Sequence, residues 1–550
     1  MRSLGIKTGI ITSEDTKIVS KRAKKMKIDF DYIVVGSGAA GAAAAWRFSE
    51  KNASVLILEL GDYVKNDDYP TTKENWEQVK NSKFNPIASS RKGVYDYPVD
   101  DTESPIALCN YNAVGGSTIL FSAHFPRFLR KDFSIKSDQN IGVDWPISYD
   151  SILPYFDINE KEMALSGLIG DPYYPEITNA LPPVPLGKVG DTLAKGFNQL
   201  GWHWWPSFAA ISTRERNGRS KCINLGPCNA GCPQQAKSSV DQTYLKKAKS
   251  NGVRLISKFS VSKILVENDV AVGVEGFDER GKCKKFYGSK IVLAASAVGT
   301  PRILLNSHSK HYPNGLANTS GLVGKNLMIH PLGYVEGVFN DYLETDSGPQ
   351  GCLLYSLEHH RTVDSEHKLG YMMHALRGAG PVEVAKSALA KKKLRFGVSL
   401  YDDFRNIYGK QSVISIICED IPEIKNKITL DYECLDRFGQ PGVKVSYQLH
   451  ENTKKMLIHG MGNARKLFKE AGAKKSYAHG PVKNTGWHIM GTCKMGLNPQ
   501  QSVVDVNGQA HDVKNMFIVD SSVFPTSSCV NPANTIQAVA LYLADKIYEL

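Results

Sequence analysis

The chain has 550 residues, of which 42% are hydrophobic and 22% charged, and its formal net charge is +12. This length allows roughly two to four domains, and the composition excludes a disordered, collagen-like or coiled-coil protein. No apolar run reaches the ~20 residues of a membrane helix, and Lys and Arg are spread along the chain without a nucleic-acid recognition motif. We therefore expect an enzyme-sized globular protein that has no membrane span and binds no nucleic acid.

Residues 1–29 form a basic N-terminal extension, in which five Lys and Arg residues cluster between positions 21 and 27. The extension lacks the continuous apolar stretch and the small-residue cleavage site of a secretory signal. We therefore expect a cytoplasmic protein. In that compartment thiols stay reduced, so the ten cysteines favour free thiols or a metal cluster over a disulfide framework.

The first regular elements predict a nucleotide-binding unit. A buried parallel strand is expected at 31–35, and it runs directly into the glycine-rich segment 36–41. An alanine-rich helix should follow to about residue 48, and a second apolar strand at 54–58 ends at Glu59. This strand–helix–strand order, with an acidic residue at its end, is typical of a Rossmann-type site for the ADP half of FAD or NAD.

Each small residue of this unit has a physical role. Gly36 permits the tight turn, Gly38 lets the backbone approach a pyrophosphate, and Gly41 lets the helix pack closely with its N-terminus facing the phosphates. Glu59 stands where a carboxylate binds the ribose. The cofactor contacts expected here are Gly36, Gly38, Ala39, Ala40, Gly41 and Glu59.

Motifs further along the chain favour FAD. In chain order they are GGSTIL at 115–120, DWP at 144–146, VLAASAVGTPRILLNS at 292–307, VGKNLMIHP at 323–331, HIMGTCKMG at 488–496 and VDSSVFP at 519–525. Their identity and order resemble the glucose-methanol-choline (GMC) oxidoreductase family from residue 31 to the end. The resemblance implies further flavin contacts at Gly115, Gly116, Ser117, Thr118, Val261, Gly299, Asp520 and Pro532. Some relatives attach the flavin through a histidine at the position of Leu120, so we expect non-covalent FAD, although His124 lies close by.

The resemblance also implies a reaction, the oxidation of an alcohol with hydride transfer to the flavin. His488 matches the family's catalytic base, and Asn531 matches the residue that orients the substrate oxygen. Imidazole suits the first role because it is largely neutral at physiological pH and can accept a proton. His330, expected to support its loop, and His374, on an expected substrate-domain strand, are lesser candidates.

Relatives of the same plan use many alcohols, so the substrate is less constrained. Similarity to gluconate-type dehydrogenases and paromamine oxidases favours a sugar or amino-sugar hydroxyl, such as an aminoglycoside intermediate. The electrons would then pass to oxygen or to another acceptor. Two alternatives from other classes are a flavin-bearing lyase and an electron-transfer flavoprotein subunit.

Three cysteines form a separate motif, since Cys222, Cys228 and Cys232 have C-x5-C-x3-C spacing. This segment resembles the iron–sulfur segment of sugar dehydrogenases in the family, which implies a 3Fe-4S cluster. In the second interpretation, Gly226, Pro227 and Gly231 shape a tight loop and the thiols pack as small hydrophobic groups.

The spread of the flavin motifs predicts an interleaved architecture of the α/β class. A discontinuous, Rossmann-like FAD-binding domain should comprise residues 30–330, with substrate-domain insertions near 151–220, and residues 481–550, which carry the catalytic histidine. Residues 331–480 should form an α+β substrate-binding domain on an antiparallel sheet. We expect strands 413–418 and 427–432 in that sheet.

Overall fold

The computed structural model describes residues 28–361, 366–377, 379–390 and 392–550. All but the last two residues of the basic extension expected at 1–29 lie outside these ranges. Within them, no helix combines the length and apolar character that crossing a membrane requires.

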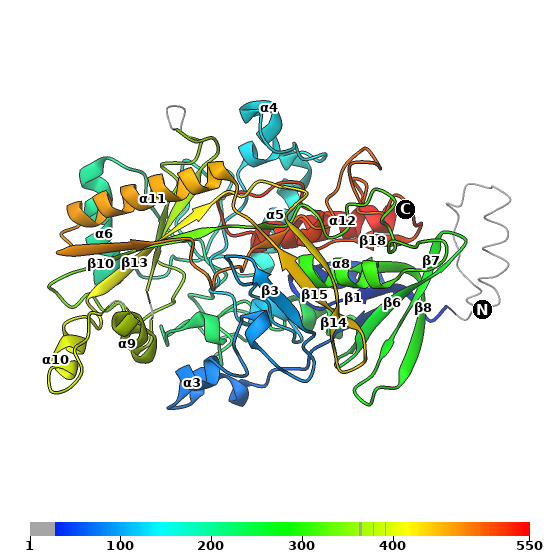
Figure 1. Cartoon of the computed structure of the whole chain (residues 1–550), viewed down its shortest axis with the longest axis horizontal. Coiled ribbons are helices and arrows are strands. Elements are labelled where there is room, and N and C mark those ends of the chain that lie inside the picture. Colours follow the sequence, from blue (N-terminus) through cyan, green and yellow to red (C-terminus); the bar gives the residue numbers. More distant parts are fainter. Residues whose placement is uncertain (1–27, 362–365, 378, 391) are drawn as a thin grey trace.

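A seven-stranded sheet forms the centre of the part drawn on the right in Figure 1. Its order is β5-β2-β1-β8-β7-β6, with β18 also pairing with β8. The strands are β1 (Phe30–Val35), β2 (Val55–Leu58), β5 (Arg254–Ile256), β6 (Ser260–Glu267), β7 (Val270–Phe277), β8 (Cys283–Leu293) and β18 (Met516–Ile518). β5, β2, β1, β8 and β18 are mutually parallel, whereas β6 and β7 join as an antiparallel extension.

The parallel strands end at one edge of this sheet. Val35 pairs with both Leu58 and Leu293, and Leu293 also pairs with Ile518. The residues that follow each strand therefore meet at a single edge, although they come from three distant parts of the sequence. In open α/β sheets this edge is where ligands bind.

Helices from both ends of the chain cover the sheet. The alanine-rich α2 (Ala39–Glu50) packs against α12 (Ala533–Glu549), which also packs against α5 (Tyr149–Glu162). Figure 1 shows the blue and red segments side by side. Arg47 of α2 donates two hydrogen bonds, of 2.9 and 2.7 Å, to the Asp545 carboxylate of α12. The small side chains of α2 allow this close approach, since Ala42 to Ala45 are fully buried.

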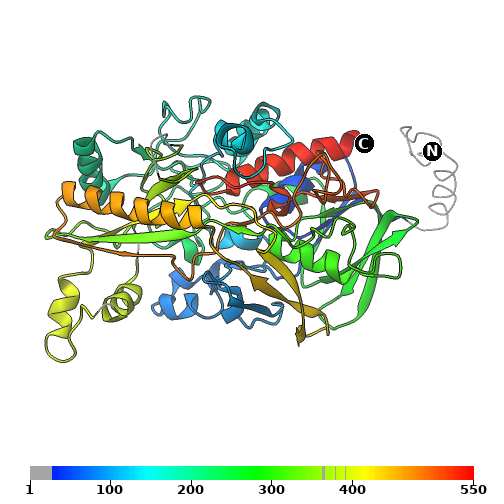
Figure 2. The same ribbon diagram turned by 45° about the horizontal axis from the view of Figure 1, so that its top comes forward.

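A second sheet, wholly antiparallel, lies in the other half of the molecule. Its order is β16-β10-β13-β12-β11-β4. The strands are β4 (Trp205–Pro206), β10 (Leu332–Val338), β11 (Leu354–Ser356), β12 (Tyr371–Leu376), β13 (Gln411–Cys418) and β16 (Lys475–His479). Helix α11 (Glu451–Glu470) packs along this sheet and against α6 (Gly187–Leu200), as the orange helix in Figure 2 shows. The α/β class, with a Rossmann-type sheet and a second antiparallel sheet, is confirmed.

One strand lies elsewhere than expected. The segment 427–432 falls in β14 (Lys427–Leu435), which pairs with β15 (Pro441–Ser446). β15 pairs in turn with β3 (Val99–Glu103), and the three strands form a separate sheet. The assignment of 427–432 to the same sheet as 413–418 was therefore wrong, because strand character does not specify the partner strand. The short β9 (Met328–Ile329) and β17 (Ile489–Met490) form a two-stranded sheet.

The remaining helices lie between or outside the sheets. They are α3 (Trp76–Lys80), α4 (Ile135–Gln139), α7 (Tyr244–Ser250), α8 (Ser296–Asn306), α9 (Pro381–Ala390) and α10 (Leu400–Arg405). Short 3-10 helices at Gly116–Ile119 and Ser521–Val523 follow the glycine-rich loop and β18. The division into domains at residues 330 and 480 stays a prediction.

Candidate active site

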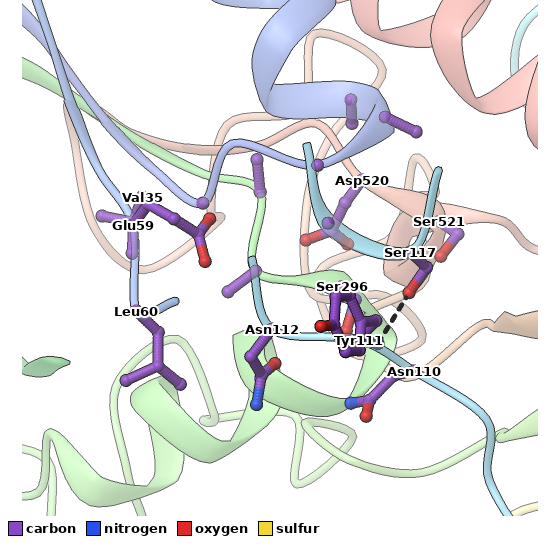
Figure 3. A pocket seen from close by; sticks show the side chains of 18 of the residues that line it. Val35, Glu59, Leu60, Asn110, Tyr111, Asn112, Ser117, Ser296, Asp520 and Ser521 are labelled. Carbon is purple, nitrogen blue, oxygen red and sulfur yellow. Dashed lines mark hydrogen bonds between the residues drawn. The ribbon is translucent and has the colours of Figure 1, made fainter. Parts of the chain in front are cut away.

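A cavity with about 1180 Å³ of empty space lies at the carboxyl ends of the parallel strands. Gly36 after β1, Glu59 after β2, Ala294 after β8 and Asp520 after β18 all line it. Figure 3 shows Glu59 and Leu60 on one side of this cavity, with Ser296, Asp520 and Ser521 on the other. Its walls therefore combine the ends of four parallel strands, which is where an open α/β sheet binds a nucleotide cofactor.

Two glycine-rich loops form the floor of the cavity. A Cβ atom on Gly116 would lie 2.8 Å from the Cα of Gly38, and one on Gly41 would lie 2.0 Å from the carbonyl oxygen of Gly36. Gly36 has φ +102°, a conformation that side chains strongly disfavour. The spacing of these glycines thus reflects real steric limits, and the exposed backbone between them fits the pyrophosphate of a dinucleotide.

Two buried carboxylates lie at opposite ends of this floor. Glu59 accepts hydrogen bonds from the Ser37 backbone N–H (2.9 Å), the Ser37 hydroxyl (2.7 Å) and the Gly61 N–H (2.8 Å). Asp520 accepts from the Thr300 hydroxyl (2.6 Å) and from the Ser522 N–H (2.9 Å). Burial raises the pKa of both carboxyl groups above the ordinary values. These bonds hold both carboxyl groups in fixed orientations at the cavity wall.

The structure brings most of the expected cofactor residues together at this cavity. Those that line it are Gly36, Gly38, Ala39, Ala40, Glu59, Gly116, Ser117, Thr118, Val261, Gly299, Asp520 and Pro532. Gly41 and Gly115 do not line it: Gly41 packs α2 against the turn after β1, and Gly115 forms the bend at φ +98° before the 3-10 helix.

Sequence reasoning missed a polar segment of the same cavity. Asn110, Tyr111 and Asn112 line it and end two residues short of the paired glycines, and the Tyr111 N–H donates to the Ser117 hydroxyl over 3.1 Å (Figure 3). Their position just before Gly115 is the one signal that could have indicated them.

His488 and Asn531 meet at one end of this cavity. Their neighbours Trp487, Ile489 and Pro532 line the cavity, although His488 and Asn531 do not. The Asn531 Nδ2 lies 3.0 Å from the His488 Nε2. Forty-two residues lie between the two positions, and Asn531 stands two residues before the start of α12 at Ala533.

His330, expected to support its loop, also contacts His488. The antiparallel register pairs Ile489 with Ile329, so His488 and His330 emerge together, with their Nδ1 atoms 3.0 Å apart. Burial lowers the pKa of His488 to about 3 and that of His330 well below its usual value. Both imidazoles are therefore neutral at physiological pH.

Two further histidines lie next to this group. The rings of His124 and His374 stack with centroids 4.1 Å apart. Besides burial, His374 lowers the pKa of His488, and both His374 and His488 lower the pKa of His124. The rings therefore belong to one buried cluster. β12 of the antiparallel sheet supplies His374, whereas His124 follows the loop of paired glycines.

The three cysteines of the C-x5-C-x3-C motif line a separate, smaller cavity. Lys237 connects this loop to the cofactor side, since its Nζ donates to the carbonyl oxygens of Cys228 (2.7 Å), Ile119 (2.8 Å) and Phe121 (2.9 Å). Within the described ranges, which contain all ten cysteines, none forms a disulfide.

Known proteins resemble the chain over most of its length. The model of the GMC oxidoreductase family matches residues 30–332 with its N-terminal part and 422–540 with its C-terminal part. The 2-methyl-1,2-propanediol dehydrogenase of Mycolicibacterium austroafricanum is 35% identical over 94% of this chain and 95% of its own. The paromamine 6'-oxidase of Streptomyces fradiae is 26% identical over 94% and 91%. The structure of formate oxidase from Aspergillus oryzae superimposes with a TM-score of 0.68 at 17% identity, over 94% of this chain and 98% of its own.

Proposed function

The chain belongs to the GMC oxidoreductase family, and from this we propose that it oxidises an alcohol to an aldehyde or ketone, with His488 as the base. FAD, bound along the glycine-rich floor, would supply the hydride acceptor. One observation carries the proposal: a neutral, buried imidazole and an amide meet where the cavity lined by the cofactor residues ends.

His488 is suited to remove the hydroxyl proton. With the Asn531 amide donating to Nε2, this nitrogen carries the lone pair, and the Nδ1–H can donate to the Nδ1 of His330. His330 therefore fixes the tautomer and the ring orientation of His488. Because burial lowers the pKa of His488 to about 3, the imidazole is unprotonated at neutral pH and its lone pair is free to accept the hydroxyl proton.

Asn531 is suited to orient the substrate. Its Oδ1 is buried and has no hydrogen-bond partner in the part of the chain that the structure describes. A buried acceptor of this kind is unfavourable unless a ligand or a water satisfies it. A substrate hydroxyl that replaces Nε2 of His488 at the amide N–H would accept from Asn531 while its own hydrogen points to Nε2, and Oδ1 could accept from another donor of the substrate.

We propose that FAD is held without a covalent bond. The residue at the family's attachment position, Leu120, is fully buried and carries no nucleophile. The nearby His124 stacks on His374. Acid precipitation tests this directly, because non-covalent FAD stays in the supernatant, whereas a yellow pellet would contradict the proposal.

Anaerobic flavin reduction tests the role of His488. The His488→Gln variant should retain FAD but reduce it about 10² to 10⁴ times more slowly with an alcohol substrate, the usual cost of losing a general base. The matched control is His311→Gln, at a histidine that is 72% exposed. Equal reduction rates in both variants would remove His488 from the mechanism. Failure of every alcohol to bleach the wild-type flavin, with cyanohydrin cleavage present, would favour the lyase alternative.

The substrate class is part of the proposal. We retain a sugar hydroxyl, and four neutral, buried imidazoles favour an uncharged substrate over a cationic amino sugar: His488, His330, His124 and His374. A panel of 2-methyl-1,2-propanediol, neutral sugars and paromamine tests this. Preferential flavin reduction by paromamine would contradict the neutral pocket and restore the aminoglycoside interpretation.

We also keep the iron–sulfur cluster as a proposal. Burial raises the pKa of the Cys228 thiol to about 12 and that of the Cys222 thiol above its ordinary value, and the nearby cations Lys237 and Arg377 offset part of this rise. These charges suit an anionic cluster. Iron and acid-labile sulfide should be present in the wild type and in Cys434→Ser, an exposed control, and absent from Cys228→Ser. Protein purified anaerobically without iron would show that the segment is only a loop.

A further inference from the structure

His124 is a buried polar residue that the proposed mechanism does not use. Its side chain is 2% exposed. Neither ring nitrogen has a hydrogen-bond partner within residues 28–361, 366–377, 379–390 and 392–550. A neutral imidazole presents one donor and one acceptor, and leaving both unpaired in the interior is unfavourable. Native proteins accept this arrangement where a ligand or an ordered water completes the bonds.

The backbone around His124 is also unusual. Ala123, which is fully buried, has φ +71°, a conformation that residues with a side chain rarely adopt. Such strain persists only when the surrounding structure enforces it, and it concentrates at functional sites. Here the enforcing contacts are the Phe125 N–H bond to the Phe208 carbonyl and the Ala210 N–H bond to the Ala123 carbonyl, both 2.8 Å. They hold His124 in place against His374.

His374 complements His124 chemically. Its Nε2 lies 2.8 Å from the Gly351 carbonyl oxygen, so this nitrogen carries the hydrogen. Burial lowers the pKa of His374 to about 4, so the ring is neutral and its Nδ1 is an acceptor. The stacked pair thus offers one donor and two acceptors. A hydroxyl group, which both donates and accepts, matches this set, whereas an ammonium group would find no counter-charge.

We propose that His124 and His374 form a subsite for a second hydroxyl of the substrate, next to the hydroxyl that His488 deprotonates, so that the enzyme selects 1,2-diols and polyols over simple alcohols. The Asn534 amide donates to the Phe125 carbonyl oxygen over 3.3 Å, so the residue after His124 contacts the start of the helix that follows Asn531, the partner of His488. The subsite rests on the proposed function, since it needs His488 at the reacting hydroxyl. The subsite requires that a good substrate carry a second hydroxyl beside its oxidisable carbon.

The test compares three alcohols on the FAD-loaded enzyme by anaerobic flavin reduction. 1,2-Butanediol, 1-butanol and 1,4-butanediol share the same chain and a primary hydroxyl, but only the first has its second hydroxyl on the neighbouring carbon. We expect the second-order rate constant of flavin reduction by 1,2-butanediol to exceed both others about 100-fold in the wild type, the order of two well-made hydrogen bonds. His124→Phe should reduce this ratio to a few-fold. His124→Gln, which keeps a donor and an acceptor, should retain much of it.

His311→Phe, at an exposed histidine, is the matched control and should keep the wild-type ratio. A wild-type ratio near one, or an unchanged ratio in His124→Phe, would overturn the subsite while leaving alcohol oxidation intact. If His124→Phe does not fold with flavin, the wild-type ratio and the His124→Gln ratio decide the question. If no alcohol bleaches the wild-type flavin, the proposed function fails, and the subsite fails with it.

Discussion

The contact between the two glycine loops gives a sharp test of the cofactor site. In Gly116→Ala, the new Cβ would lie 2.8 Å from the Cα of Gly38. Carbon atoms in contact prefer about 3.5–4.0 Å, so the loops must separate by about 0.7 Å. Both loops line the cavity, and their separation should therefore weaken FAD binding directly.

The expected effect of Gly116→Ala on stability and on FAD affinity follows from two separate free-energy costs. Gly116 has φ +54°, and a left-handed alanine costs about 1–2 kcal/mol of folding stability. The added steric strain costs about a further 1–3 kcal/mol, as for other overpacked sites. Only the second cost acts on the cavity, so the dissociation constant of FAD should rise about 5- to 150-fold.

Gly281→Ala is the matched control. Gly281 has φ +77°, and no atom lies within 4 Å of the position that a Cβ would take, so it incurs the left-handed cost without the clash. FAD titration of the flavin-depleted proteins, followed by flavin fluorescence, measures affinity, and urea unfolding measures stability. Equal FAD affinity in the two variants would refute the proposal that the two glycine loops bind FAD.

Two further predictions concern stability. Burial lowers the pKa of His488 to about 3 and of His374 to about 4, so the unfolded chain takes up protons below pH 6.5 that the folded chain does not. Stability should be full above pH 6.5 and fall as the pH drops toward 4, by up to about 1.4 kcal/mol per pH unit for each histidine. In urea titrations of the flavin-depleted protein, His488→Gln should lose one such contribution, and an unchanged pH slope would contradict the assignment. Arg361 forms ion pairs with the buried carboxylates of Asp132 and Glu419. Arg361→Met should lower the free energy of unfolding by about 3–5 kcal/mol, and a loss below about 1 kcal/mol would show that the carboxylates tolerate the missing charge.

Local features of the site could be predicted from the sequence because they depend on neighbouring residues. The strand ending at Val35, the glycine spacing that follows it and the helix from Ala39 are consequences of backbone conformation and side-chain size. The ordered motifs also predicted the family and the sheet architecture. The roles of His488 and Asn531 remain predictions, although the fold places their side chains 3.0 Å apart.

The pairing of distant segments was decided only by the tertiary structure. The β9–β17 register brings His330 to His488, and the antiparallel sheet carries His374 to His124. The tertiary structure also places β14 and β13 in different sheets, whereas the sequence pattern had assigned both strands to one sheet. A strand pattern specifies which faces are apolar, but not which strand becomes its partner. The sequence by itself therefore determined the cofactor-binding unit and the family, whereas the buried histidine cluster arises from contacts between segments that lie far apart in the chain.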